Sequence, residues 1–266
     1  MSSQYDHRPP DPRQSLVAAV RGYSQAVCEQ TGVLCPTWRE AVTIGSVPGL
    51  LLAIYFLLQR SFDGWRQLGY VRHAATQITP ANQIAPDPLI PHVTLWHELT
   101  RVSHVLIHAP GTYHTHVVGN ALLIGSAAWA LLTVLTALGR RRWFVYVYWE
   151  LVTVAPIIGS FAFDLFGTTA RGFGASTVGY AFLGIVAVVS VLALVSSRRG
   201  QASQQSERCL DIDTPVSPVL VCGVLVIACT VVISDVVSGS PAMPVHQAGV
   251  GFGIVVGTFV VPLVPA

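Results

Sequence analysis

The sequence predicts an all-α membrane protein built as a bundle of six transmembrane helices. Of its 266 residues, 52% are hydrophobic and 11% are charged, whereas soluble domains carry about 25% charged residues. The long apolar runs show no strand-like alternation, and a helix satisfies its own backbone hydrogen bonds in lipid. All 15 basic residues are arginine and the net charge is only +2. We therefore expect the lipid bilayer, and no nucleic acid, as a partner.

A helix needs about 20 apolar residues to cross the hydrocarbon core, and six segments of the chain supply them. The first follows a polar stretch that lacks the pattern of a cleavable signal peptide. The chain is therefore expected to divide into a partly disordered cytoplasmic tail, residues 1–40, and a membrane domain, residues 41–266. The expected spans are 41–59, 116–138, 143–163, 174–196, 216–234 and 245–263.

The arginines indicate the orientation of the bundle. They gather in the N-terminal tail and in the connections after the second and fourth spans, which all face one side. Because cytoplasmic loops carry an excess of basic residues, we expect this side, and both termini, to be cytoplasmic. The segment 60–115 also holds four arginines, but long loops count less in this rule. Cys28 and Cys35 could pair, although cytoplasmic thiols usually stay reduced.

Three segments outside the spans have their own expected structure. Residues 78–95 contain four prolines and should form a loop on the outer side. Residues 96–109 could be helical, with Trp96 suited to the membrane interface. Residues 14–30 could form an amphipathic helix on the membrane surface or a loosely packed linker.

Polar residues of chemical interest stand at the starts of the second, fourth and sixth spans, which all run inward from the outer side. They are His116 and Asn120, Ser176, and His246. At a rise of about 1.5 Å per residue they lie within the first turns of their helices, so the bundle could bring them together. Gly249 and two further glycines at four-residue intervals should let the sixth span pack closely against Ala175 and Gly179 of the fourth.

These residue types suit acyl transfer. A serine hydroxyl becomes a nucleophile when a histidine takes its proton, and the oxyanion that then forms needs fixed hydrogen-bond donors. Asn120, His116 and the free backbone N–H of Ser176 at a helix start could donate to it. Serine and histidine at such positions also have a structural interpretation, as packing or interfacial residues.

Several segments resemble, in order, motifs of the rhomboid family of intramembrane serine proteases, and the likeness covers about residues 41–264. Residues 174–184 (GASTVGYAFLG) are similar to the nucleophile segment, 116–120 (HVVGN) to its His-x-x-x-Asn, and 246–253 (HQAGVGFG) to its histidine and glycines. Residues 101–108 (RVSHVLIH) resemble the arginine and histidines of the first outer loop. Thr177 stands where the family often has glycine, and Gln247 where an apolar residue is usual.

The resemblance implies a rhomboid-like fold and a serine endopeptidase that cleaves transmembrane helices of membrane proteins near the outer leaflet. It implies that Ser176 is the nucleophile and His246 the general base, in a dyad with no essential acid. His116 and Asn120 would help to form the oxyanion hole. Tyr180 would pack against the His246 ring, with Gly174 supporting the nucleophile segment. No cofactor and no metal are implied.

Two other functions stay open. His104 and His108 have a workable metal-ligand spacing, with His114 and His116 nearby, although the segment His97–Arg101 misses the zinc-protease pattern HExxH at its last residue. Alternatively, the chain could be a catalytically weak or inactive rhomboid-like protein that binds membrane helices. Thr177, which could crowd the oxyanion position, favours that alternative, whereas the presence of both serine and histidine argues against it.

Overall fold

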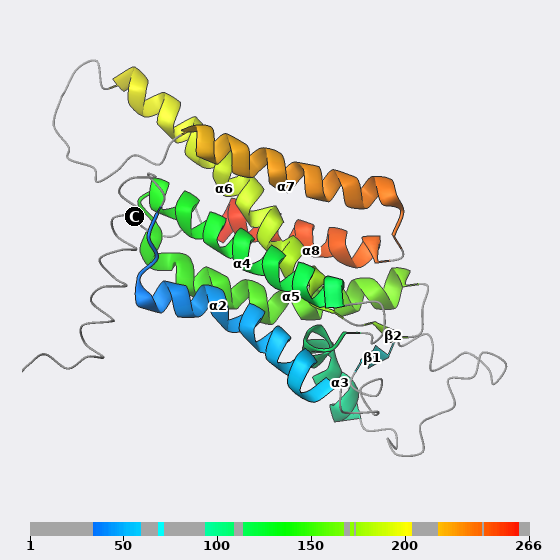
Figure 1. Ribbon diagram of the computed structural model, residues 1–266. Helices are drawn as coiled ribbons and strands as arrows, with labels where there is room; N and C mark the ends of the chain where they lie inside the picture. The colour runs from blue at the N-terminus through cyan, green and yellow to red at the C-terminus, as the bar shows by residue number, and fades with distance from the viewer. Residues whose placement is uncertain are drawn as a thin grey trace, which may run out of the picture.

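Helices make up nearly all of the part of the chain that the computed structural model describes, which is residues 34–59, 69–71, 94–108, 114–167, 171–172, 174–203, 218–240 and 242–260. They pack side by side into one bundle (Figure 1). The long helices are α2 (Trp38–Ala53), extended by the π-helical turn η1 (Ile54–Leu58); α4 (His114–Ala137); α5 (Phe144–Phe166), preceded by the 3-10 turn η7 (Arg141–Trp143); α6 (Ser176–Ser203); α7 (Pro218–Ser238); and α8 (Met243–Val255), extended by the π-helical turn η8 (Val256–Val260).

Within the described residues, five helices are long and apolar enough to cross a membrane. They coincide with the first five expected spans, which indicates a multi-pass integral membrane protein. The sixth expected span, 245–263, coincides with α8 and η8, and its crossing of the membrane stays a prediction. The predicted disordered tail and the amphipathic helix at 14–30 lie outside the described residues, as does nearly all of the proline-rich loop. The five helices are Trp38–Leu58, His114–Ala137, Arg141–Phe166, Ser176–Val195 and Val219–Ser238.

Helix α2 begins three residues before the expected start at Ala41, because its first turn carries a capping box. The Thr37 hydroxyl accepts a hydrogen bond from the Glu40 N–H (3.4 Å), and the Glu40 carboxylate accepts one from the Thr37 N–H (2.6 Å). These bonds satisfy two donors that a helix start leaves free. The Thr-x-x-Glu pattern at 37–40 was a signal for this boundary.

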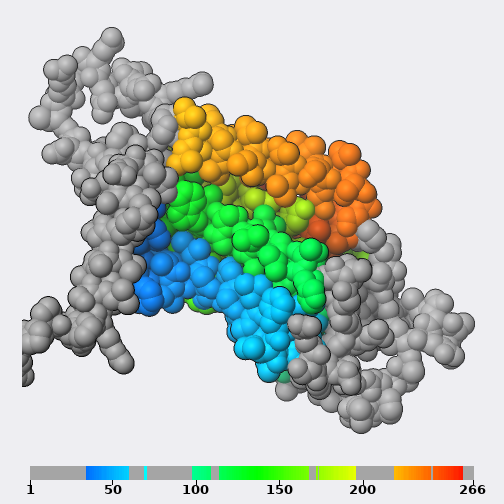
Figure 2. Space-filling view, in the orientation of Figure 1, coloured from blue at the N-terminus to red at the C-terminus, as the bar shows by residue number. Residues whose placement is uncertain are grey.

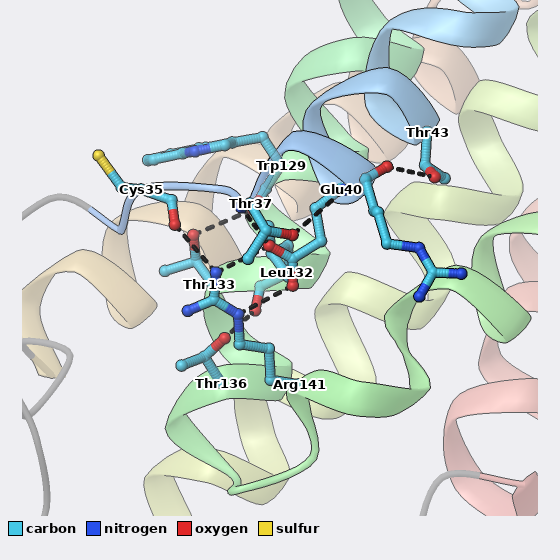
Figure 3. A network of polar contacts seen from close by, with 10 residues as sticks. Cys35, Thr37, Glu40, Thr43, Trp129, Leu132, Thr133, Thr136 and Arg141 are labelled. Atoms are coloured by element: carbon cyan, nitrogen blue, oxygen red, sulfur yellow. Dashed lines mark hydrogen bonds and ion pairs between the residues drawn. The ribbon is translucent and has the colours of Figure 1, made fainter. Parts of the chain in front are cut away.

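The starts of α2 and α5 are joined by one arginine (Figure 3). Arg141 donates from Nε and Nη2 to the two carboxylate oxygens of Glu40, at 2.8 and 2.7 Å, and from Nη2 to the Cys35 carbonyl at 2.9 Å. This bidentate ion pair neutralises the buried Glu40 carboxylate and fixes this end of the bundle. Cys35 is also disulfide-bonded, so this cysteine is paired, a possibility that the sequence left open.

Helix α6 is the central element of the bundle. In its 18-residue apolar stretch, 67% of the residues are buried, against 17% in the corresponding stretch of α7. Its side chains at Ala181, Phe182, Ile185 and Val189 are fully enclosed. Figure 2 shows α7 along one edge of the molecule and α2 along the other, with α4 between them on the face in view. The helix that bears Ser176 therefore has its neighbours fixed on several sides.

The glycines of α8 pack against α6, as expected, but on a different face. Added methyl groups at Gly249 and Gly253 would meet the backbone oxygens of Thr177 and Ala181. Gly179, predicted as part of this contact, faces Leu123 on α4 instead. The contact follows the i, i+4 row through Thr177 and Ala181, because Ala175 and Gly179 lie on another side of α6.

A short outer layer closes the end of the bundle at which α4, α6 and α8 begin. It contains the helix α3 (Thr94–Ser103) with the 3-10 turn η6 (His104–Leu106), and an antiparallel pair of two-residue strands, β1 (Tyr70–Val71) and β2 (Arg171–Gly172). Arg101 of α3 donates to the carboxylate of Asp164 (3.1 Å) and to Ser160 (3.1 Å), both on α5. These bonds anchor the helical segment that was expected within 96–109.

Replacing Gly253 by alanine should destabilise the bundle by about 1–3 kcal/mol, because the added methyl group overpacks the contact with α6. Gly251 provides a matched control on the same helix, since nothing lies within 4 Å of a methyl group added there. Thermal unfolding in detergent measures both variants. Equal melting temperatures for G253A and G251A would contradict this account of the α6–α8 contact.

Candidate active site

The nucleophile candidate lies at the first residue of α6. Gly174 precedes it with a φ of +105°, a conformation that side chains other than glycine rarely adopt. This turn lets the Gly174 N–H donate to the His104 carbonyl at 3.1 Å, which ties η6 to the start of α6. Ala175 then accepts from the N–H groups of Val178 and Gly179.

The backbone N–H groups of Ser176 and Thr177 come too early in α6 to have an intrahelical acceptor. Within the described residues, neither donates another hydrogen bond. The dipole of a helix is positive at this end. The start of α6 can therefore hold a negatively charged oxygen.

His246 lies in the first turn of α8, and two side chains fix its ring. Tyr180 stacks on it, with ring centroids 4.2 Å apart and planes 6° from parallel. Asp235, in the last turn of α7, accepts a hydrogen bond from Nδ1 at 2.8 Å. The stack that the resemblance implies is therefore present, and a carboxylate that it does not imply is present as well.

The remaining ring nitrogen of His246, Nε2, is buried and has no hydrogen-bond partner within the described part of the chain. Because Nδ1 carries the proton that Asp235 accepts, Nε2 of the neutral ring holds a free lone pair. Tyr180 lies one turn after Ser176 on the same face of α6, so the stack brings the His246 ring to the start of that helix. No hydrogen bond joins His246 to Ser176, and such bonds are often long before substrate binds.

The two oxyanion candidates on α4 differ in their surroundings. Asn120 is buried, and its Nδ2 lies 3.0 Å from Nε2 of His108. If Nδ2 donates one hydrogen there, its second hydrogen stays available. His116 is exposed, its ring meets that of His108 edge to face at 5.7 Å, and its Nε2 would lie 3.6 Å from a methyl group added at Gly174.

Thr177 does not occupy the space between Ser176 and α4. Its methyl group would lie 2.7 Å from a methyl group added at Gly159 of α5 and 3.2 Å from one added at Gly249 of α8. The side chain therefore fills the space that these two glycines leave. The predicted crowding of the oxyanion position by Thr177 is not seen.

Sequence reasoning missed Asp235 and the role of Gln247. The fifth expected span ended at residue 234, so Asp235 was treated as the boundary of an apolar run, yet it is buried at 7% exposure. Gln247 Nε2 donates to its second carboxylate oxygen at 3.4 Å. The pattern that could have indicated this contact is a carboxylate and an amide, each at the end of an apolar run and 12 residues apart in the sequence.

The described residues contain no group of three or more histidine, cysteine or acidic side chains placed to hold a metal ion. The two histidines with ligand spacing have other partners. His104 Nδ1 lies 3.0 Å from the Thr100 carbonyl, and His108 Nε2 bonds Asn120. The His104 ring therefore stabilises α3, and the His108 ring joins the outer layer to α4.

Comparisons with known protein families, curated proteins and solved structures found no match for this chain. The resemblance described above consequently depends on the motifs in this sequence.

Acid should destabilise the outer layer through its buried histidines. Burial lowers the pKa of His104 from 6.5 to about 4 and that of His108 likewise, with the neighbouring His116 adding to the effect on His108. Because the unfolded chain takes up these protons at higher pH than the folded one, stability should fall as the pH drops from 6.5 toward 4. For His104 the expected loss by pH 4 is on the order of 3 kcal/mol.

Thermal unfolding measured across that pH range tests this expectation. His104→Asn can keep the bond to the Thr100 carbonyl but does not titrate, so its melting temperature should depend less steeply on pH. His114→Gln, at an exposed histidine, is the control and should follow the wild type. A wild-type slope in H104N would show that His104 is not responsible.

Proposed function

We propose that this protein is a rhomboid-like intramembrane serine endopeptidase with six transmembrane helices and both termini in the cytoplasm. Ser176 attacks the scissile carbonyl, and His246 acts as general base and then as general acid. The substrates are transmembrane helices of other membrane proteins, cleaved near the outer leaflet where small or helix-disrupting residues permit local unwinding. The reaction requires no cofactor.

The observation that carries this proposal is the state of the His246 ring. The ring is buried, stacked on Tyr180 and bonded through Nδ1, while its Nε2 has no partner among the described residues. A buried nitrogen without a hydrogen bond costs free energy. A serine hydroxyl at the start of α6 would satisfy it, and that pair is the one that acyl transfer needs.

The neighbourhood of Ser176 also suits the charge that develops in acyl transfer. Free backbone N–H groups at the start of α6 and the Asn120 amide can donate to an oxyanion. The helix fixes the position of the backbone N–H groups before substrate binds, and the hydrogen bond with His108 fixes that of the Asn120 amide. The position of Thr177 between Gly159 and Gly249 supports an active enzyme over an inactive helix-binding protein, because its side chain fills the space that these glycines leave.

Ser176→Ala and His246→Ala should each lower cleavage at least about 1000-fold. The assay uses the full chain in liposomes with a labelled single-span substrate. Ser190→Ala is the matched control, because Ser190 is a fully buried serine on the same helix without a hydrogen-bond partner for its hydroxyl in the described residues. It should cleave like the wild type.

The remaining outcomes identify the alternatives. Equal cleavage by all four proteins would mean that Ser176 is not the nucleophile. No cleavage by any of them, with substrate still bound, would mean that the chain captures membrane helices without cutting them.

Asn120→Ala should lower kcat about 100- to 1000-fold with little change in KM, because an oxyanion donor acts in the transition state. Ser126→Ala on the same helix is the control, since the only acceptor of this exposed hydroxyl in the described part of the chain is the Leu123 carbonyl. Steady-state cleavage gives both constants. A rise in KM at constant kcat would place Asn120 in substrate binding instead.

A further inference from the structure

We propose that Asp235 is a positioning residue for His246, so that the reaction uses a Ser-His-Asp arrangement instead of a dyad. It holds the ring with Nε2 facing Ser176 and stabilises the imidazolium that forms when that nitrogen takes the serine proton. This inference rests on the proposed function, and it departs from the absence of an essential acid that the resemblance implies.

The hydrogen bond between Asp235 and His246 is short, and both side chains are buried. Oδ1 of Asp235 lies 2.8 Å from Nδ1 of His246, and the two side chains are only 5% and 10% exposed. A bond to Nδ1 decides which tautomer a neutral imidazole adopts. With the proton on Nδ1, Nε2 can accept from Ser176.

The location of Asp235 is costly for a residue with a purely structural role. It lies in the last turn of α7, where the helix dipole disfavours negative charge, and it is buried, which penalises an ionised carboxylate without partners. The other residues of α7 carry no charge. Replacing a whole buried pair by apolar residues of similar volume often leaves stability unchanged or improves it, so the presence of this pair requires another explanation.

The side chains that Asp235 contacts belong to the candidate active site, which suggests a role in catalysis. Oδ1 accepts from His246, Oδ2 accepts from Gln247 at 3.4 Å, and the carboxylate also interacts with the Tyr180 side chain. Gln247 stands where the resemblance would place an apolar residue. Its amide gives the second carboxylate oxygen a donor, so the two departures from the family pattern form one unit.

The charged and titratable groups that face His246 come from three helices. They are Asp235 of α7, Tyr180 of α6 and His116 of α4, with Gln247 beside it on α8 as a neutral donor. Of these, Asp235 is the group whose negative charge can offset the positive charge on the ring. The effect of pH on the reaction should therefore depend on this carboxylate.

The proton steps balance with Asp235 remaining ionised throughout. The Ser176 oxygen bonds to the scissile carbon while its proton passes to Nε2 of His246. Collapse of the tetrahedral intermediate breaks the C–N bond, and the same proton goes to the leaving nitrogen. Water then attacks the acyl group on Ser176, gives its proton to Nε2, and that proton returns to the serine oxygen as the acid is released.

The test measures how fast a fluorophosphonate labels Ser176 in the full chain, together with substrate cleavage, as a function of pH. Asp235→Asn should slow both reactions by about 100- to 10,000-fold and change their dependence on pH. Ser238→Ala is the control at the same helix end, where its hydroxyl donates, among the described residues, only to the Asp235 main-chain carbonyl. It should behave as the wild type, and D235N should cost nothing further in the His246→Ala background.

Two results would overturn the proposal while leaving the proposed function intact. One is D235N activity within about threefold of the wild type with an unshifted pH profile. The other needs no Asp235 variant and so does not depend on its folding: nitrogen NMR of wild-type His246 showing the proton on Nε2 instead of Nδ1 at neutral pH. If wild-type Ser176 is neither labelled nor able to cleave substrate, the proposed function fails and this inference fails with it.

Discussion

The site depends on how closely α6 and α8 approach each other. Lipid tails are as apolar as the helices, so helices associate in a membrane by close packing and not by exclusion of water. Gly184 of α6 meets the Val250 carbonyl, and Gly253 of α8 meets the Ala181 carbonyl, both without room for a methyl group. This separation lets the Tyr180 and His246 rings lie in direct contact.

The buried charged side chains of the described residues, Glu40, Arg101 and Asp235, are all paired, as the cost of burying an isolated charge requires. The Glu40 carboxylate accepts two hydrogen bonds from Arg141. The Asp164 carboxylate accepts from Arg101 and Tyr70. Two buried rings among the described residues, those of His246 and His108, are bonded through only one nitrogen. The stack on Tyr180 places the His246 ring beside the start of α6, where a serine could use its free nitrogen.

The sequence was sufficient for the helices because apolar runs of about 20 residues leave few alternatives in a chain with so little charge. It was less informative wherever the outcome depended on which faces meet. The partner of the α8 glycines was predicted as the right helix but the wrong face, since periodicity alone does not say how two helices are rotated. Asp235 was missed for a related reason, because burial and the bond to His246 arise only when α7 and α8 are side by side. The capping box at Thr37 was local and could have been predicted.

The backbone bond from Gly174 to His104 has a mechanical consequence. Arg101 fastens the outer helical segment to α5, and the His104 carbonyl fastens the same segment to the residue two positions before Ser176. The position of the first turn of α6 is therefore coupled to that of the segment formed by α3 and η6. The connection from His104 to Ser176 consists of one hydrogen bond and two peptide units.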